Sequence, residues 1–302
     1  MKPSITFDEL VKESSLQQAE RLAYIDFKIR YLGEISRGEI IEEFKIGQAA
    51  ASGDLKLYRE FRENNAYRDH TTKKTVINTE LYIPLVKLDV HTALNFIHHG
   101  FCRNELMEKK SMVPLEVIDP RMSPDSLNEE DVATVTRAIT SKSGFSCGYF
   151  SASSGDHHER LLFPTALFVD RKYWYFRAYD RSENSEKTGF KNFKLARLKD
   201  VQWCPKLKPN PDEDFYHDKA WHTLLPLQLV IHEDRKEAAK SLEREFGLVD
   251  GKLTITCQAA LAYFIRHNWR IDVGNGEKGY FNFRLENSEG LKQIEYAAGL
   301  FG

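Results

Sequence analysis

Polar and basic side chains follow one face of a helix that the spacing predicts over residues 48–61. Ala51, Leu55 and Tyr58 stand at i, i+4 and i+7, which is the apolar stripe of a helix packed on a core. The opposite face offers groups that hydrogen-bond base edges and phosphates when a helix lies in a major groove. This outward face consists of Gln48, Ala49, Ser52, Lys56 and Arg59.

The neighbouring segments complete the pattern of a winged helix-turn-helix. A short helix over 37–44 and a turn containing Gly47 precede the helix expected over 48–61. After that helix, strand-like segments at 66–68 and 75–77 flank a polar loop. Such a hairpin is a candidate wing, and its basic side chains suit DNA phosphates. The phosphate-binding candidates are Arg37, Arg68, Lys73 and Lys74.

The charge of this region favours nucleic acid locally, although the whole chain has a formal charge of −2. From Lys45 to Lys74, seven basic side chains stand against four acidic ones, which leaves the segment at +3. A pair of solvated helices that contacts only protein is the alternative, and Gly53 inside the helix costs about 1 kcal/mol relative to alanine. The basic residues counted are Lys45, Lys56, Arg59, Arg62, Arg68, Lys73 and Lys74.

A second candidate site lies on strand-like segments in the middle of the chain. Alternation over 173–179 places Trp174, Phe176 and Ala178 toward a core and the intervening residues on the other face. An arginine beside tyrosine rings and serine hydroxyls could bind a phosphate and stack a base. Ordinary outward-facing residues of a half-buried sheet are the alternative. The side chains concerned are Tyr149, Ser151, Ser153, Tyr175, Arg177 and Tyr179.

Two motifs resemble enzyme signatures but stand in the wrong context. Gly144-Phe-Ser146-Cys-Gly148 matches a nucleophile elbow, which needs a strand before it and a helix after it, whereas the pattern here is the reverse. The loop that carries His157 and His158 supplies no convincing partner for Ser146. Gly274-Asn-Gly276-Glu-Lys-Gly279 matches a dinucleotide fingerprint but leads into a strand, so we interpret it as a hairpin turn. We therefore expect no enzymatic activity.

No cofactor or metal is expected either. The four cysteines stand about fifty residues apart without a Cys-x-x-Cys pair, which favours reduced thiols. The pairs His98-His99 and His157-His158 lack spaced carboxylate or thiol partners for a metal ion. The N-terminus has no signal-peptide pattern, and the longest apolar stretch, 161–169, is too short to span a bilayer. These features predict a soluble cytoplasmic protein with no membrane partner.

The order of the expected elements predicts a multidomain α+β protein, since 302 residues suit two or three domains. Helices are expected over 7–32, ending at Gly33, over 85–110 and over 128–142. Strands at 147–152, 161–169, 173–179 and 190–198 predict a small β-barrel. A linker over 206–214 precedes strands at 227–232, 253–256 and 279–285 and helices at 235–246 and 259–269, which predict a ferredoxin-like unit. The expected domains are a winged helix-turn-helix (1–84), a helical connector (85–115), a sensing domain (116–205) and a C-terminal α+β domain (206–302).

Several of these segments together resemble one family. Arg21–Gly33 followed by Ala51–Tyr58 resembles the N-terminal winged helix of WYL-domain transcriptional regulators. Tyr173-Trp-Tyr-Phe-Arg-Ala-Tyr179 looks like the segment that names the family, with Phe176 in place of leucine. Tyr149–Ser154 with Pro164, and Phe190–Leu198, are similar to its opening and closing strands. The resemblance covers nearly the whole chain and is strongest to the BrxR and CapW type.

The resemblance implies a homodimeric repressor of a phage-defence operon that binds an inverted repeat. It implies an Sm/SH3-like barrel for the WYL domain, which would sense a nucleotide or single-stranded nucleic acid, and a C-terminal dimerisation domain. An activator of DNA-damage genes is the alternative, with a hydrolase that uses Ser146 as a remote one. The family pattern extends the candidate ligand set to Tyr149, Ser151, Ser153, Ser154, Arg160, Tyr175, Arg177, Tyr179, Phe193 and Arg197.

Overall fold

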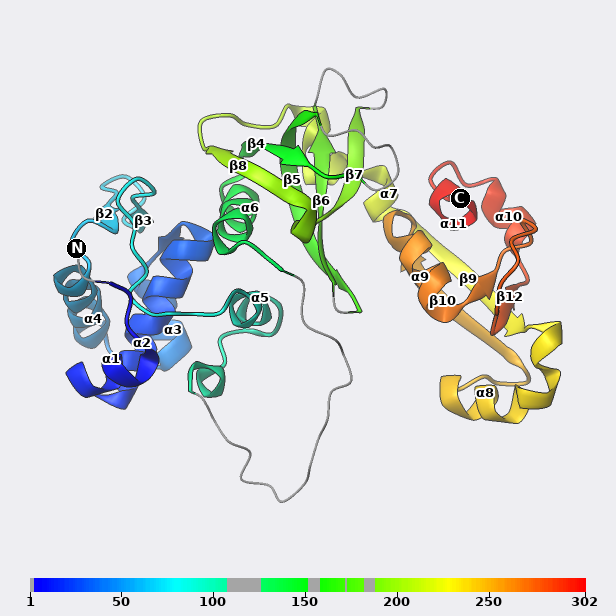
Figure 1. The fold of residues 1–302 in the computed structure, drawn as a ribbon, viewed down its shortest axis with the longest axis horizontal. Coiled ribbons are helices and arrows are strands. Elements are labelled where there is room, and N and C mark those ends of the chain that lie inside the picture. Colours follow the sequence, from blue (N-terminus) through cyan, green and yellow to red (C-terminus); the bar gives the residue numbers. More distant parts are fainter. Residues whose placement is uncertain (1–2, 108–125, 152–157, 172, 182–187) are drawn as a thin grey trace. The chain divides into compact units, whose positions relative to one another are not determined.

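The computed structural model describes residues 3–107, 126–151, 158–171, 173–181 and 188–302 (Figure 1). The chain divides into two compact units, residues 1–209 and 210–302. The boundary falls within the linker expected at 206–214. Each unit is described by itself.

The first unit begins with three consecutive helical segments in place of the single helix expected over 7–32. The side chain of Thr6 caps the first helix and that of Ser15 caps the second. The helical run is therefore broken between Glu13 and Leu16. Gly33 ends the last segment with φ of 84°, as expected for a left-handed cap. The segments are α1 (Phe7–Glu13), α2 (Leu16–Phe27) and the π-helix η1 (Lys28–Leu32).

The helix-turn-helix and the wing form where the sequence predicts them. Lys45, with φ of 54°, and Gly47 make the turn between α3 (Arg37–Phe44) and α4 (Gln48–Phe61). The wing strands β2 (Ala66–Arg68) and β3 (Thr75–Ile77) pair antiparallel. A short strand not expected from the sequence, β1 (Glu34–Ile35), joins β3 and gives the sheet order β1-β3-β2.

The connector and the middle of the chain follow. The expected helix over 85–110 is α5 (Val90–His99) and a short 3₁₀ segment, η2 (Arg103–Leu106). Helix α6 (Glu129–Ser141) is capped by Asn128 and packs on the sheet that follows and on η1. Buried side chains of the winged helix, α5, α6 and the sheet belong to one continuous hydrophobic core.

The sheet of the first unit has five antiparallel strands in the order β7-β6-β5-β4-β8. The sequence placed a single strand over 190–198, but the 3₁₀ turn η3 (Leu195–Arg197) interrupts it and a fifth strand follows. Among the described residues no pairing joins β7 to β8, so a closed Sm/SH3-like barrel is not confirmed. The strands are β4 (Gly144–Tyr149), β5 (Glu159–Asp170), β6 (Tyr173–Asp180), β7 (Gly189–Lys194) and β8 (Leu198–Cys204).

The second unit is a four-stranded mixed sheet, order β10-β9-β12-β11, with helices packed on one face. The strands β9 and β10, which flank the first long helix, are antiparallel neighbours. In a ferredoxin-like unit the two strands flanking a helix run parallel with another strand between them, so that arrangement is not confirmed. After short turns at η4 (Pro211–Glu213), η5 (Phe215–His217) and α7 (Lys219–His222), the elements are β9 (Leu224–Ile231), η6 (Glu233–Ala238), α8 (Ala239–Phe246), β10 (Lys252–Gln258), η7 (Ala259–Leu261), α9 (Ala262–Trp269), β11 (Ile271–Asp272), β12 (Phe283–Leu285), α10 (Ser288–Lys292) and α11 (Ala298–Phe301).

The structure contradicts the interpretation of the glycine-rich segment before β12, residues 274–279, as a hairpin turn. Gly274 and Gly276 do adopt left-handed φ angles of 75° and 78°. However, β11 and β12 run parallel to one another, whereas a tight hairpin turn joins antiparallel strands. The segment is therefore a longer loop between parallel strands.

In the part of the chain that the structure describes, no helix combines the length and apolar character needed to cross a bilayer.

A buried carboxylate ties α4 to the rest of the winged helix. Asp26 Oδ1 accepts hydrogen bonds from the hydroxyls of Tyr58 (2.7 Å) and Tyr82 (2.8 Å). Its Oδ2 accepts from the backbone amides of Leu85 (2.9 Å) and Val86 (3.2 Å). Burial raises the pKa of Asp26, and the four hydrogen bonds offset part of that rise. Asp26 thus joins α2 to α4 and to the segment that follows the wing.

We expect Asp26→Asn to lower the free energy of unfolding by roughly 2 to 6 kcal/mol. An asparagine amide can accept only on one side, so two buried donors lose their acceptor at about 1–3 kcal/mol each. Urea denaturation of the purified variant measures the change, with Asp212→Asn, at an exposed position, as the control. A change no larger than that of the control would show that the network does not hold the domain together.

Candidate nucleic-acid interface and sensing face

Helix α4 turns its apolar stripe inward and its polar face outward, as the spacing predicts. Ala51 and Tyr58 are fully buried and Leu55 is 9% exposed. On the outward face Gln48, Ala49, Lys56 and Arg59 are exposed, while Ser52 is half-buried. Arg37 at the start of α3 is also exposed, and its Nη1 donates to Ser52 Oγ at 3.3 Å. These side chains lie at the surface, where a major groove could receive them.

An ion pair fixes the position of α4 against α2. Arg21 Nε lies 2.6 Å from Asp54 Oδ2, and Gln18 Nε2 donates to Oδ1 of the same carboxylate at 3.4 Å. Asp54 is only 2% exposed, so it does not reduce the charge of the outward face as the sequence count assumed. Its spacing could have shown this, because Asp54 shares the buried stripe with Ala51, Leu55 and Tyr58.

Arg62 was counted among the basic side chains of this segment, but it is not available at the surface. It is 7% exposed, and its Nη2 donates to the backbone carbonyls of Pro3 (2.7 Å) and Pro84 (3.1 Å). This guanidinium holds the N-terminal segment and the chain after the wing together. Because it is buried in that role, it cannot contribute a phosphate contact.

The wing presents two exposed cations and one that is engaged within the protein. Arg68 and Lys73 are exposed, and Lys73 has φ of 59° at the tip of the loop. Lys74 donates to the carboxylate of Glu34, which raises the pKa of Lys74. Asp69 closes the loop by accepting from the amide of Thr71 at 2.7 Å. Arg68 and Lys73 are therefore the side chains of the wing best placed to reach phosphates.

The predicted sensing residues fall on two opposite faces of the sheet. Cross-strand partners share a face. Arg160 stands opposite Cys147, and Phe193 stands opposite Phe176, on the face of the core. The residues on the other face are Tyr175, Arg177 and Tyr179, with their partners Lys194, Asn192 and Phe190. Strand alternation therefore separates Arg160 and Phe193 from Tyr175, Arg177 and Tyr179, so these five side chains do not line one pocket.

On the core face, the guanidinium of Arg160 is matched by a buried carboxylate. Its Nη1 lies 2.7 Å from Asp180 Oδ2, which also accepts from Lys191 Nζ at 2.9 Å. Asp180 is fully buried. The guanidinium lies 5.7 Å from the ring centroid of Tyr149 and 6.0 Å from that of Phe193. This cluster forms a charged layer in the core, in which Asp180 offsets the charge of Arg160.

On the other face, Arg177 lies among aromatic rings. It is 5% exposed, its Nη1 donates to Asn192 Oδ1 at 3.2 Å, and its guanidinium lies 5.8 Å from the ring centroid of Phe190. Tyr179 packs edge-on against the same Phe190 ring, with 5.2 Å between centroids. Tyr175 stacks on Phe168 at the same centroid separation. A cation among rings is an arrangement that can bind a phosphate beside a stacked base.

Two of the remaining predicted residues lie outside the strands, Ser151 just after the end of β4 and Arg197 in η3. Ser151 and Arg197 are half-buried, and the carbonyl of Arg197 accepts from the amide of Phe150 at 3.0 Å. Ser153 and Ser154 lie outside the described residues. Ser146 is inside strand β4, which follows α6, so the nucleophile-elbow context is missing as expected.

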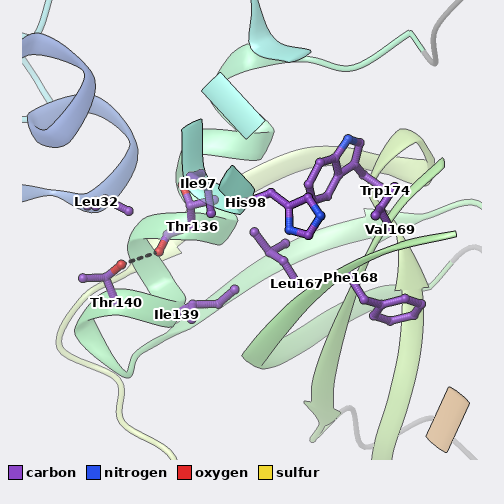
Figure 2. Close-up of a pocket in the computed structure, with 10 residues that line it drawn as sticks. All are labelled: Leu32, Ile97, His98, Thr136, Ile139, Thr140, Leu167, Phe168, Val169 and Trp174. Carbon is purple, nitrogen blue, oxygen red and sulfur yellow. Dashed lines mark hydrogen bonds between the residues drawn. The ribbon is translucent and has the colours of Figure 1, made fainter. Parts of the chain in front are cut away.

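A pocket of about 530 Å³ opens where the winged helix, the connector and the sheet meet (Figure 2). Its walls come from η1, α5, α6, β5 and β6, elements that are far apart in the sequence. No periodicity or motif brings these residues together, so the sequence carried no signal for this pocket. The lining residues are Leu32, Ile97, His98, Thr136, Ile139, Thr140, Leu167, Phe168, Val169 and Trp174.

Comparison with known families matches three regions in the order of the domains. The WYL domain matches residues 130–203. The BrxR transcriptional regulator winged helix-turn-helix domain matches residues 17–99. The BrxR transcriptional regulator C-terminal dimerization domain matches residues 224–291.

Full-length relatives agree with these matches. The DNA-binding transcriptional repressor CapW of Stenotrophomonas maltophilia is 27% identical over 284 residues, with 91% of each chain covered. CapW of Pseudomonas aeruginosa is 25% identical, covering 92% of this chain and 91% of that protein. Among solved structures, the proteasome accessory factor B/C of Arthrobacter aurescens has a TM-score of 0.24 and 14% identity. This chain spans about half of that structure's length (48%), and the score is too low to support an argument.

Three domains in this order define a winged-helix transcriptional regulator with a WYL domain. Within that class both the terminal domains and the full-length relatives support the BrxR and CapW type, to which this chain is similar.

Proposed function

We propose that this protein is a sequence-specific DNA-binding repressor that acts in the cytoplasm. The observation that carries the proposal is the outward face of α4, which is held in position by the Arg21–Asp54 pair and by Asp26. Relatives that cover nine-tenths of the chain are named as DNA-binding transcriptional repressors, which supports it. The phage-defence operon that the resemblance implies is the proposed target.

In the proposed complex α4 lies in the major groove and the wing lies on the adjacent backbone. Gln48, Lys56 and Arg59 would contact base edges or phosphates, and Arg37, Arg68 and Lys73 would contact phosphates. Lys74 would contribute less to phosphate binding, because its ammonium group already pairs with the Glu34 carboxylate. The relatives named as transcriptional repressors favour a regulator over a hydrolase that uses Ser146.

We propose that the protein binds an inverted repeat as a homodimer formed through the second unit. The match of that unit to a dimerization domain supports this. One face of its sheet is open: Leu224 is 60% exposed, and Pro226, Thr254 and Thr256 beside it are exposed. Two-fold symmetry of such a dimer would present two winged helices to two half-sites.

The effector proposal narrows to one face of the WYL sheet. We propose that the Arg177 face, with Tyr175, Tyr179 and Phe190, receives a nucleotide or the end of a short single strand. The guanidinium of Arg177 supports this because it lies 5.8 Å from the ring centroid of Phe190, on which Tyr179 also packs. Arg160 suits this role less well, because the buried Asp180 already holds it.

We expect Lys56→Ala and Arg59→Ala each to weaken binding to the DNA upstream of the gene by about tenfold. Contacts of this kind contribute roughly 1–3 kcal/mol each. A mobility-shift titration against unrelated competitor duplex measures the affinity, with Lys240→Ala in the second unit as the control. Unchanged affinity in both variants would remove α4 from the interface.

Gly53→Ala should separate folding from DNA binding. An added Cβ meets nothing within 4 Å in the free protein, so the helix should become about 1 kcal/mol more stable. Gly53 stands one turn from Ala49 and Lys56 on the outward face, so the same methyl group would press against the groove and weaken DNA binding. Gly290→Ala, in a helix of the second unit with equal space, is the matched control. A more stable variant with unchanged DNA affinity would contradict the proposed docking of α4.

Arg177→Ala should abolish the response to effector while sparing DNA affinity in its absence. The operator complex of the wild type and of the variant is titrated with 5′-phosphorylated dinucleotides and oligonucleotides. The matched variant Lys199→Ala, on an exposed position of β8, should respond as the wild type does. A normal response of Arg177→Ala would exclude this face as the effector site.

A further inference from the structure

The pocket at the junction of the winged helix, the connector and the sheet has walls from both domains of the first unit. Leu32 closes it from the end of η1, and His98 borders it from the end of α5. The side chains of α6 and of β5 and β6 form the other walls (Figure 2). Its volume of about 530 Å³ is within the ~300–1,000 Å³ of pockets that hold small molecules.

The described residues that line this pocket favour an uncharged ligand over an anionic one. None of the ten is a lysine or an arginine, so no permanently charged lining residue faces a phosphate, and none is an aspartate or a glutamate. Most are aliphatic or aromatic. The ring of Trp174 meets that of His98 edge-on, with centroids 6.0 Å apart at 90°. These rings and aliphatic walls favour an uncharged planar ring system.

The two threonine hydroxyls of the lining call for a hydrogen-bond donor on the ligand. The hydroxyl of Thr136 donates to the carbonyls of Val132 (3.1 Å) and Ala133 (3.0 Å). The hydroxyl of Thr140 donates to the carbonyl of Thr136 at 2.9 Å. Each hydroxyl hydrogen is therefore in use, and both groups can offer a ligand only their lone pairs. An N–H group on the ligand matches them.

We propose that this pocket binds a neutral aromatic nitrogen heterocycle that carries an N–H group. The site is distinct from the Arg177 site, because Arg177, Tyr175, Tyr179 and Phe190 do not line it; the two share only Phe168, which stacks on Tyr175. It does not depend on the protein binding DNA.

The position of the pocket gives such a ligand a route to the DNA-binding domain. Arg137, next to Thr136 on α6, is 2% exposed and donates from Nη1 to the carbonyl of Arg30 on η1 at 3.0 Å. Arg30 in turn lies 2.8 Å from Glu129 on α6. A ligand between Leu32 and α6 would press on the same joint. Through it, the ligand would change the affinity for DNA, a consequence that rests on the proposed function.

Fluorine NMR with 5-fluoroindole as the probe tests the site on the full chain without DNA. We expect saturable binding to the wild type. His98→Ala should weaken it about five- to tenfold, because one ring of the wall is lost. Thr140→Phe, at an exposed position on the rim, should fill the pocket and abolish binding. The matched control is His99→Ala, since His99 is exposed on the same helix end but does not line the pocket.

The absence of saturable binding to the wild type would overturn the proposal, as would equal effects of His98→Ala and His99→Ala. Circular dichroism of each variant shows whether it is folded. Because His98→Ala and Thr140→Phe are independent, the other variant still tests the site if one of them does not fold. A mobility shift with added 5-fluoroindole then tests the coupling: the wild type should change its DNA affinity, and His98→Ala should not. Binding by NMR without such a change would overturn the coupling. A failure of DNA binding itself would appear only in the mobility shift.

Discussion

The buried guanidinium of Arg137 joins the two domains of the first unit, and the placement of both candidate sites depends on it. It donates to the backbone of η1, to the carboxylate of Glu130 and to the hydroxyl of Thr134 at 2.9 Å, and it lies 5.4 Å from the ring centroid of Trp203. A planar group with five donors can satisfy several acceptors on different elements at once. A π-helix is rare, and η1 places its carbonyl where that donor can reach it. The winged helix is thereby fixed to the sheet through one continuous core.

Several basic side chains of this protein hold structural elements together and are therefore not available to bind DNA. Arg21, Arg62 and Arg137 all bind partners inside the winged helix or at its joint. Buried arginines need such partners, because an unpaired charge in the interior is costly. The cations left for DNA are fewer, but helix α4 that carries them is held rigidly by Asp54 and by the hydrogen bonds around Asp26. Sequence-specific contacts need that rigidity, since a base edge is read only by side chains in fixed positions.

The WYL domain separates two kinds of chemistry by strand alternation. On the core face, the two cations Arg160 and Lys191 share the carboxylate of Asp180. The other face holds Arg177 among aromatic rings, and the junction pocket beyond it is uncharged. A protein with this arrangement could respond to two ligand classes: one with a phosphate at the sheet, and one without at the joint.

The sequence by itself determined the local elements: α3, α4, the wing and the strands β5 and β6, because period and turn residues act within a few neighbours. It also determined which side chains of α4 face outward. Only the tertiary structure decided that Arg62 is buried, that Arg160 and Phe193 lie on the opposite sheet face from Arg177, and that β11 runs parallel to β12. It alone placed Leu32, His98 and Trp174 around one pocket. The reason is physical: these outcomes depend on pairing between segments distant in the chain, and no local spacing encodes which partner a strand or a guanidinium will find.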